Sequence, residues 1–388
     1  MSSTILLAPL KGDAPPEVSR RIPMLPEEII AEILLRIPVK SLLQFRCVCK
    51  SWKSIISDPQ FVKKHLHRST TDANFSRHRV VFSTETDTQF VIDGIIECSI
   101  HSLFNNPATS VDASYRMTPC FKVVGSCNGL LCLASITEES SWVRLWNPTT
   151  RWVSKIFPYL GDGWRTSVNS SVVFGFGHDH LIDNYKVVSI FYTDGHGLPK
   201  TVKVCTLGDN SWTQMQSFPS STRIFYDSGK FVGGSLNWLV VRSDGPCYYF
   251  VVSFNLAKET CDQLLLPDND SDQFLPHAVE VLRDSLCFTY GLKGTHFVLW
   301  LMKEYGVKES WTKLVTIPYV DIGVSGNFFG PTIFSIRSET GEVLFGVNFN
   351  QIAIYNPRDN TLRYPQIKDY VKLFDPVVYI ESMVSPCC

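Results

Sequence analysis

The chain has 388 residues, of which 44% are hydrophobic and 19% are charged, and this balance favours a substantial folded core over a disordered chain. Its 36 basic and 37 acidic residues nearly cancel, which argues against a nucleic-acid-binding protein with a global basic excess, and no nucleic-acid partner is expected. No window of 18 or more uncharged apolar residues occurs, so the sequence predicts no membrane-spanning helix and no membrane partner.

The first 20 residues are expected to form a flexible leader, because a short apolar run is followed at once by charged residues and prolines. This pattern is not that of a secretory signal sequence. The 12 cysteines are scattered without any C-x-x-C pair, and several lie within apolar runs. Reduced, buried cysteines of this kind are typical of a reducing compartment, so we expect a location in the cytoplasm and/or nucleus.

A first helix is predicted over residues 25–38. Its isoleucines recur every four residues and share one face, as in an amphipathic helix. They are Ile29, Ile33 and Ile37. Pro26 suits the first helical position, where its missing N–H would be unpaired in any case. Pro38 is expected to end the helix, because its ring clashes with the preceding turn.

Two further helices complete a predicted three-helix head. Residues 41–56 are expected to form a single helix with one apolar stripe, and a third short helix opens at Pro59. Apolar residues occur on more than one face of these helices, which indicates a partner surface. From Arg21 to Arg68 there are nine basic and four acidic residues, so an acidic partner would be attracted. The second helix shows no row of Asn, Gln or Arg for reading base edges, which disfavours a DNA-binding helix-turn-helix.

About a dozen positions of this head match the F-box consensus in order and spacing. The matching residues are Leu25, Pro26, Ile29, Ile33, Leu34, Ile37, Pro38, Leu42, Val48, Cys49, Lys50 and Trp52. The head therefore resembles an F-box, and the resemblance implies that it binds a Skp-type adaptor and, through it, a cullin and a RING subunit. By the same resemblance all of these residues except Lys50 are expected adaptor contacts. An ordinary helical cap folded onto the following domain is the alternative.

After about residue 70 the helical spacing gives way to short β-branched and aromatic runs between Gly, Asn, Asp and Pro turns, which is typical of an all-β domain. The first strands are expected at residues 79–83 and 89–93. A unit of strand, polar turn, second strand and proline then recurs five times, with a period of about 50 residues. The closing prolines are Pro158, Pro219, Pro267, Pro318 and Pro365.

This period suits one four-stranded β-propeller blade, with each recurring unit supplying the outer hairpin. Together with an N-terminal group of strands it predicts a β-propeller of about six blades. A last strand at residues 377–384 is expected to complete the first blade and close the ring, which removes exposed sheet edges. A large β-sandwich is the alternative fold.

The β domain also resembles the F-box-associated domain of plant F-box proteins, often described as F-box/kelch-repeat. The sequence motifs that carry this resemblance lie at residues 127–132, 145–148, 174–177, 183–188 and 237–238. Only Gly233 and Gly234 supply the double glycine of true kelch repeats, so the kelch label describes the general shape. Pollen S-locus F-box receptors share this layout and remain an alternative. The expected α+β multidomain chain has a leader at 1–20, an F-box at 21–68, a linker at 69–76 and the β domain at 77–384.

Few residues suggest chemistry. His178, Asp179, His180 and Asp183 are the densest cluster of metal-capable groups, and because they sit in one turn-like stretch a solvated loop is expected there. Cys127 has no assignable His and Asp partners, so a buried strand cysteine is expected. No catalytic residue, metal or cofactor is predicted. Trp164 and Arg165, which follow Gly163, are the candidate substrate contacts, because both residue types are enriched at interface hot spots.

The resemblance to an F-box protein implies the substrate-recognition subunit of a Skp–cullin–F-box (SCF) E3 ubiquitin ligase. The head would bind the adaptor, the β domain would bind an unknown protein substrate, and the chain itself would be a non-catalytic adaptor. A propeller enzyme or a ligand-binding module with an unrelated helical leader is the alternative.

Overall fold

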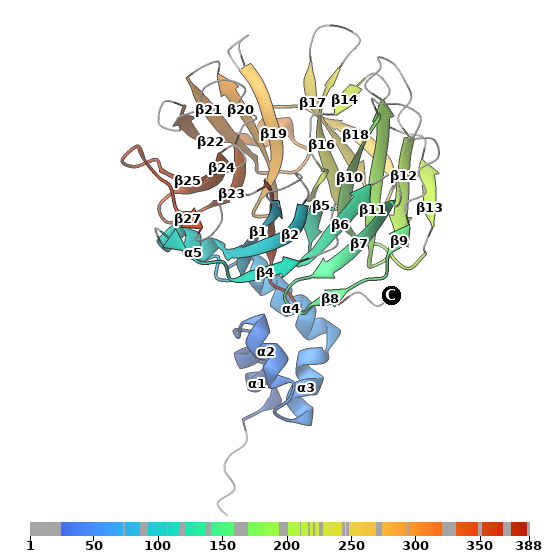
Figure 1. Cartoon of the computed structure of the whole chain (residues 1–388), viewed down its shortest axis with the longest axis vertical. Helices are drawn as coiled ribbons and strands as arrows, with labels where there is room; N and C mark the ends of the chain where they lie inside the picture. The colour runs from blue at the N-terminus through green and yellow to red at the C-terminus, as the bar shows by residue number, and fades with distance from the viewer. Residues whose placement is uncertain are drawn as a thin grey trace, which may run out of the picture.

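The computed structural model is an α+β chain in which a small helical head projects from a ring of β-sheets (Figure 1). The structure describes residues 25–72, 74–85, 92–106, 108–116, 121–136, 141–158, 170–193, 201–209, 211–215, 218–219, 222–224, 228–242, 245, 248–268, 274–292, 295–319, 331–347, 351–367 and 374–385. None of the helices in these ranges combines the length and the hydrophobicity of a transmembrane segment.

The head contains four short helices within the described residues. They are α1 (Glu27–Leu34), α2 (Val39–Phe45), α3 (Lys50–Ser57) and α4 (Pro59–Thr70). Pro26 and Pro38 have extended backbones and are the N-caps of α1 and α2, so the prediction for Pro26 was wrong by one position. Pro59 opens α4 as predicted, and the side chain of Asp58 accepts hydrogen bonds from the next two free N–H groups.

The predicted single helix over 41–56 is wrong, because α2 and α3 are separate helices. The chain turns at residues 46–49, where Cys49 is extended and its Sγ accepts a hydrogen bond from Trp52 N at 3.4 Å. Both helices bury residues in the same core, so an apolar spacing of three and four continues across the turn. The periodicity alone therefore could not reveal the break, and the predicted three-helix head has four helices.

Six sheets surround a common axis, which confirms the β-propeller and its expected six blades. Each blade runs from an innermost to an outermost strand. Blade 1 is β28 (Phe374–Ile380), β1 (His78–Glu85), β2 (Ile92–Ser99) and β4 (Ala113–Arg116); blade 2 is β5 (Lys122–Cys127), β6 (Leu130–Ile136), β7 (Ser141–Asn147) and β8 (Trp152–Val153), with β9 (Phe157–Pro158) also on β7; blade 3 is β10 (Ser170–Asp179), β11 (Asn184–Thr193), β12 (Thr201–Thr206) and β13 (Trp212–Met215).

The remaining blades follow the same order. Blade 4 is β14 (Thr222–Ile224) and β15 (Lys230–Val232), both on β16 (Ser235–Arg242), then β17 (Tyr249–Asn255) and β18 (Thr260–Leu264); blade 5 is β19 (Phe274–Leu282), β20 (Ser285–Leu292), β21 (His296–Met302) and β22 (Trp311–Pro318), with a short 3-10 turn η2 (Lys308–Ser310) before β22; blade 6 is β23 (Thr332–Ile336), β24 (Val343–Val347), β25 (Gln351–Asn356) and β26 (Thr361–Arg363). Residues 86–91 lie outside the described part, so the strand predicted at 89–93 is seen only where β2 begins at Ile92.

The core of the ring lies between blades rather than within a single layer. Each of six buried clusters takes side chains from two neighbouring blades. On β1, for example, Val80 and Phe82 pack toward blade 6 whereas Val81 packs toward blade 2. This alternation follows from the two-residue period of a strand with both faces buried. It excludes the alternative β-sandwich, in which two sheets would share one core.

Strand β28 pairs antiparallel with β1 and is the innermost strand of blade 1, so the predicted closure of the ring by the last strand is confirmed. The predicted outer hairpins are also present, as in β7–β8 and β25–β26. In the first of these turns the side-chain oxygen of Asn147 accepts hydrogen bonds from the backbone N–H groups of Thr149 (2.9 Å) and Thr150 (3.2 Å). Such caps fix the turn, as expected for an Asn placed before a Pro.

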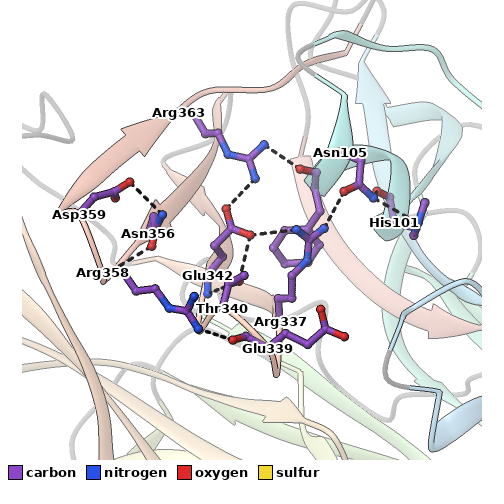
Figure 2. A network of polar contacts seen from close by, with 11 residues as sticks. His101, Asn105, Arg337, Glu339, Thr340, Glu342, Asn356, Arg358, Asp359 and Arg363 are labelled. Carbon is purple, nitrogen blue, oxygen red and sulfur yellow. Dashed lines mark hydrogen bonds and ion pairs between the residues drawn. The ribbon is translucent and has the colours of Figure 1, made fainter.

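The boundary between blades 6 and 1, called the seam below, is stabilised by further contacts that the sequence did not predict. Helix α5 (Ile100–Asn105) follows β2, and the short strand β27 (Gln366–Ile367) pairs in parallel with β3 (Ala108–Thr109). Figure 2 shows a polar network here, in which Glu342 of the β23–β24 connection binds Arg337 at 3.0 Å and Arg363 at 2.9 Å. Both arginines also donate hydrogen bonds to α5, and so join blade 6 to blade 1.

Candidate docking surfaces of the head and the propeller

One set of apolar side chains on the head faces solvent. Leu25, just before α1, is 56% exposed, Ile29 and Ile33 on α1 are each 47% exposed, and Val48 between α2 and α3 is 60% exposed. Four such side chains on a small helical unit are more than isolated surface residues, and they indicate a protein-binding surface. All four belong to the adaptor contacts that the sequence predicts.

The other predicted adaptor contacts differ in how much of each residue is exposed to solvent. Pro26, Pro38 and Cys49 are exposed, and Ile37 and Trp52 are half-buried. Trp52 packs edge-on against Phe45 at 5.5 Å between ring centroids, which joins α3 to α2. Leu34 and Leu42 are fully buried in the head core, so here they support the helices from inside rather than face a partner.

The exposed surface of the head is also positively charged. The exposed basic residues are Arg36, Lys40, Arg46, Lys50, Lys53, Lys63, Lys64 and Arg68. Only four acidic residues, Glu27, Glu28, Glu32 and Asp58, are exposed on the same helices. The head would therefore attract an acidic protein surface.

The head is fixed to the ring by buried polar contacts. Arg77, just before β1, is 7% exposed and donates hydrogen bonds to Ser69 Oγ at 2.9 Å and to the carbonyls of Leu35 and Ile37 at 3.3 Å. His65 Nε2 lies 2.9 Å from the Ile37 carbonyl. Burial lowers the pKa of His65 to about 4, so at neutral pH the ring is neutral and its Nε2–H donates to that carbonyl.

The C-terminal segment after β28 passes between the head and the ring. Met383 packs into the head core beside Leu34, Leu42 and Phe61. Asn147 holds this segment, because its side-chain nitrogen donates to two of its carbonyls at 3.1 and 2.8 Å. Residues at opposite ends of the chain therefore share one hydrophobic core, and the head and the propeller form a single connected body.

A charged cluster lies at the same junction. Arg79 Nη2 is 2.9 Å from Glu381 Oε1, its Nη1 is 3.0 Å from Asp112 Oδ2, and its Nε is 3.7 Å from Glu97 Oε1. Burial alone would lower the pKa of Arg79, but the surrounding carboxylates, with Glu381 the strongest, raise it. Burial raises the pKa of Glu97, which is 1% exposed. This cluster joins β1, β2 and the C-terminal segment, so we interpret it as structural.

The stretch with His178 and Asp183 is only in part the solvated loop that the sequence predicts, because His180 and Asp183 are exposed in the turn after β10 whereas Asp179 is buried at the end of that strand. Asp179 is 2% exposed and binds Lys186 at 2.9 Å, and Lys186 also binds Glu259 of blade 4 at 2.8 Å. Asp183 binds His178 at 3.2 Å. The Lys186–Glu259 ion pair connects blade 3 with blade 4, whereas the other two contacts lie within blade 3. Throughout the ranges that the structure describes, no group of three or more His, Cys, Asp or Glu is placed to hold a metal ion.

A cavity of about 630 Å³ runs along the axis of the ring and reaches the head. It is lined by the innermost strands of the blades and, at the head, by Leu66 and Thr70 of α4. Four of the charged side chains in its lining form ion pairs, Lys230 with Glu280 at 2.9 Å and Lys122 with Asp375 at 3.8 Å. The volume would suit a small ligand.

The prediction for Cys127 can be compared with the structure, whereas the prediction for Trp164 and Arg165 cannot. Cys127 is buried at the end of β5, as predicted, and burial raises the pKa of its thiol, so it is not an activated nucleophile. Trp164 and Arg165, the candidate substrate contacts, lie between β9 and β10 and outside the described residues.

Comparison with known proteins gives two family matches. Residues 22–64 match the F-box domain, and residues 81–386 match the F-box associated β-propeller domain. An F-box/kelch-repeat protein of Arabidopsis thaliana is 30% identical over 368 residues, which cover 93% of this chain and 96% of that protein. The F-box protein CPR1 of the same plant is 27% identical, over 94% of this chain and 89% of its own length. A solved structure of a nidogen/laminin complex covers 79% of this chain and 99% of the matched chain, with 9% identity and a TM-score of 0.42.

Proposed function

The chain belongs to the plant F-box proteins that carry an F-box-associated β-propeller, and from this membership we propose that it is the substrate-recognition subunit of an SCF E3 ubiquitin ligase. The observation that carries the proposal is the exposed apolar surface of Leu25, Ile29, Ile33 and Val48 on the F-box. In this role the surface binds a Skp-type adaptor, which links the chain to the cullin and the RING subunit.

The propeller holds the protein that is to be ubiquitinated. The chain supplies no chemistry of its own in this role and acts by proximity, because a bound target is kept at high effective concentration near the ubiquitin-conjugating enzyme. The fixed junction supports the role. Arg77 and Met383 tie the F-box to the ring, so the target is presented at a defined position relative to the adaptor. A loosely tethered F-box would lose this definition.

The proposal is tested by paired affinity purification with the proteasome inhibited. Wild-type protein is compared with Ile29→Asp/Ile33→Asp, which places charges on the exposed face of α1 without entering the head core. The matched control is Val153→Asp on the edge of blade 2, at a residue that is 43% exposed. We expect adaptor and cullin to be lost only from the double variant, while the target protein remains with all three. Absence of adaptor and cullin from the wild-type sample would show that the proposal is wrong.

We also propose that the protein acts in the cytoplasm and/or nucleus. Support comes from the buried cysteines of the described residues, which carry free thiols. They are Cys98, Cys127, Cys132, Cys205 and Cys287. Fluorescence microscopy of a tagged full-length chain tests this location, and accumulation in the secretory pathway would contradict it.

A further inference from the structure

The cavity along the axis of the ring is a long channel that the ring shares with the F-box. Strand β28 runs toward the F-box, because Met383, which follows its end, lies in the head core. Asp375 near the start of this strand and Ile380 at its end both line the cavity, which therefore extends for about 17 Å. Helix α4, which lies against the ring in Figure 1, adds Leu66 and Thr70 to the lining at the F-box end. A molecule that fills the channel would touch both parts of the protein.

The larger part of the channel wall is apolar, and it includes flat aromatic rings. Four phenylalanines from separate segments of the chain line the cavity: Phe75, Phe176, Phe231 and Phe334. Aromatic side chains pack well against other ring systems, either stacked or edge-on. The volume of about 630 Å³ lies within the range of small-molecule sites, which are mostly apolar with a few placed polar groups. The wall therefore favours a small ligand that contains a ring system.

The formal charges of the described lining residues cancel. Three basic and three acidic side chains line the cavity: Lys122, Lys230, Arg283, Glu280, Asp284 and Asp375. The Lys230–Glu280 and Lys122–Asp375 ion pairs neutralise four of them at close range. A charged ligand would bring a charge into the channel without a matching counter-charge, and a buried charge of that kind is costly. The lining therefore favours a ligand without net charge.

The two histidines of the described lining add no charge at neutral pH. Burial lowers the pKa values of His78 and His277 to about 4, so both rings are neutral. The half-buried residues Ser228 and Thr332 add hydroxyl groups to the same lining. Neutral imidazole and hydroxyl groups both donate and accept hydrogen bonds. They suit a few hydroxyl or carbonyl groups on an otherwise apolar molecule.

We propose that the axial channel binds a neutral organic molecule that carries a ring system and a few hydroxyl or carbonyl groups. This binding site goes beyond the proposed ligase role and does not depend on it. The ligand contacts α4 and the innermost strands together, so its binding adds to the contacts that hold the F-box on the ring. A ligand that binds only the folded chain also raises its unfolding temperature.

The test uses two fluorescent probes that share one ring skeleton and differ in charge. N-phenylnaphthylamine is neutral, anilinonaphthalenesulfonate carries one negative charge, and both brighten in apolar surroundings. Each probe is titrated into the purified full-length chain. We expect saturable binding of the neutral probe, at least about tenfold tighter than that of the anionic probe, because the sulfonate finds no unpaired counter-charge in the channel. Absence of saturable binding would refute the site, and equal affinities would refute the neutral ligand class.

A side chain that fills the channel shows where the neutral probe binds. Gly125 of β5 lines the cavity, and the atoms nearest to an added Cβ belong to Phe176, at ordinary contact distances from 3.5 Å. Gly125→Phe should therefore fold and weaken binding at least about tenfold. The matched control is Gly245→Phe at an exposed glycine, where an added Cβ meets no atom of the described residues within 4 Å, and it should bind like wild type. If Gly125→Phe has no effect, or both variants have the same effect, the channel site is refuted. Should Gly125→Phe fail to unfold cooperatively, Ala278→Leu on β19 fills the same cavity and replaces it.

Asp375→Asn tests the charge balance of the lining directly. Lys122 then loses its counter-charge, and the lining gains one net positive charge. Asp375 has a φ of 44°, a conformation that asparagine tolerates, so the backbone is preserved. We expect the anionic probe to bind about fivefold more tightly than to wild type, as for a partly exposed ion pair, and the neutral probe to bind as before. An unchanged affinity for the anionic probe would show that the charge of the lining does not select the ligand, and the neutral ligand class would be refuted.

Discussion

Individual buried polar residues determine how the F-box sits on the ring. Arg77 makes hydrogen bonds with two carbonyls at the end of α1 and with Ser69 of α4, and its own carbonyl accepts a hydrogen bond from Glu381 N at 2.9 Å. His65 satisfies the Ile37 carbonyl from another direction. Each of these groups would be a buried unpaired dipole without its partner, so the junction has one preferred geometry.

The buried histidines make the junction sensitive to acid. Burial lowers the pKa values of His65 and His78 to about 4, against 6.5 when unfolded, so the unfolded chain binds more protons between these values. The stability that the two neutral histidines contribute is therefore fully present above about pH 6.5, and it is lost as the pH falls toward 4. We expect thermal unfolding measured across this window to show a falling midpoint, and His65→Leu, which cannot be protonated, to weaken the dependence. An unchanged slope in that variant would contradict the assignment to His65.

At the level of elements, periodic features were predictable and features that depend on distant partners were not. The strands and their outer hairpins follow from alternating residues and from Asn and Pro turns that act locally. The break between α2 and α3 was missed because the apolar spacing is the same on both sides of it. The role of Asp179 was missed because its partner Lys186 is bound in turn by Glu259, 73 residues further along.

The residues of the candidate site also differ in how far the sequence could predict their positions. The exposed residues of α1 could be identified because the F-box consensus records their order and spacing. Burial of Leu34 and Leu42 could not be inferred, because it depends on α4 and on Met383, which reach the head core from elsewhere in the chain.

Removing the charge of Lys186 should weaken the link between blades 3 and 4. The ammonium group is 7% exposed and compensates Asp179, which would otherwise be a buried unpaired carboxylate. We expect Lys186→Met to lower the free energy of unfolding by about 3–5 kcal/mol in urea titrations. Lys308→Met is the contrasting variant, because its ion pair with Asp268 is exposed to solvent, and it should change little. Equal effects of the two substitutions would show that burial is not the deciding factor.

On the scale of the whole molecule, the six inter-blade cores make the ring cooperative, and the ring closes without a covalent link inside blade 1, where the C-terminal strand β28 pairs with β1. The β27–β3 pair and the network in Figure 2 hold the adjacent seam between blades 6 and 1. Burial alone would raise the pKa of Glu342, but hydrogen bonds from Arg363 and Thr340 and the charge of Arg337 hold it below its usual value. Glu342 is therefore ionised at neutral pH, and its single negative charge is shared by Arg337 and Arg363.

Glu342→Gln should loosen this seam while preserving the shape of the side chain. Two arginines lose their shared counter-charge, and since Arg363 is 44% exposed we expect a moderate loss of about 1–2 kcal/mol in chemical denaturation. Amide exchange should rise first in α5 and in the β27–β3 pair. Arg358→Gln, at an exposed arginine of the same network, is the control and should leave both measurements near wild type. A rise in exchange spread evenly over all blades would argue against a local seam.

The position of Met383 in the F-box core has a consequence for translation. The helices of the F-box leave the ribosome early, but Met383 and the closing strand β28 are made more than 280 residues after most of the residues they join, and Arg79 meets Glu381 across 302 positions. A nascent chain thus displays an F-box whose hydrophobic core still lacks a member. Under the proposed function, we expect a prematurely terminated chain, which lacks Met383, to carry a destabilised F-box and to bind the adaptor more weakly than the complete chain.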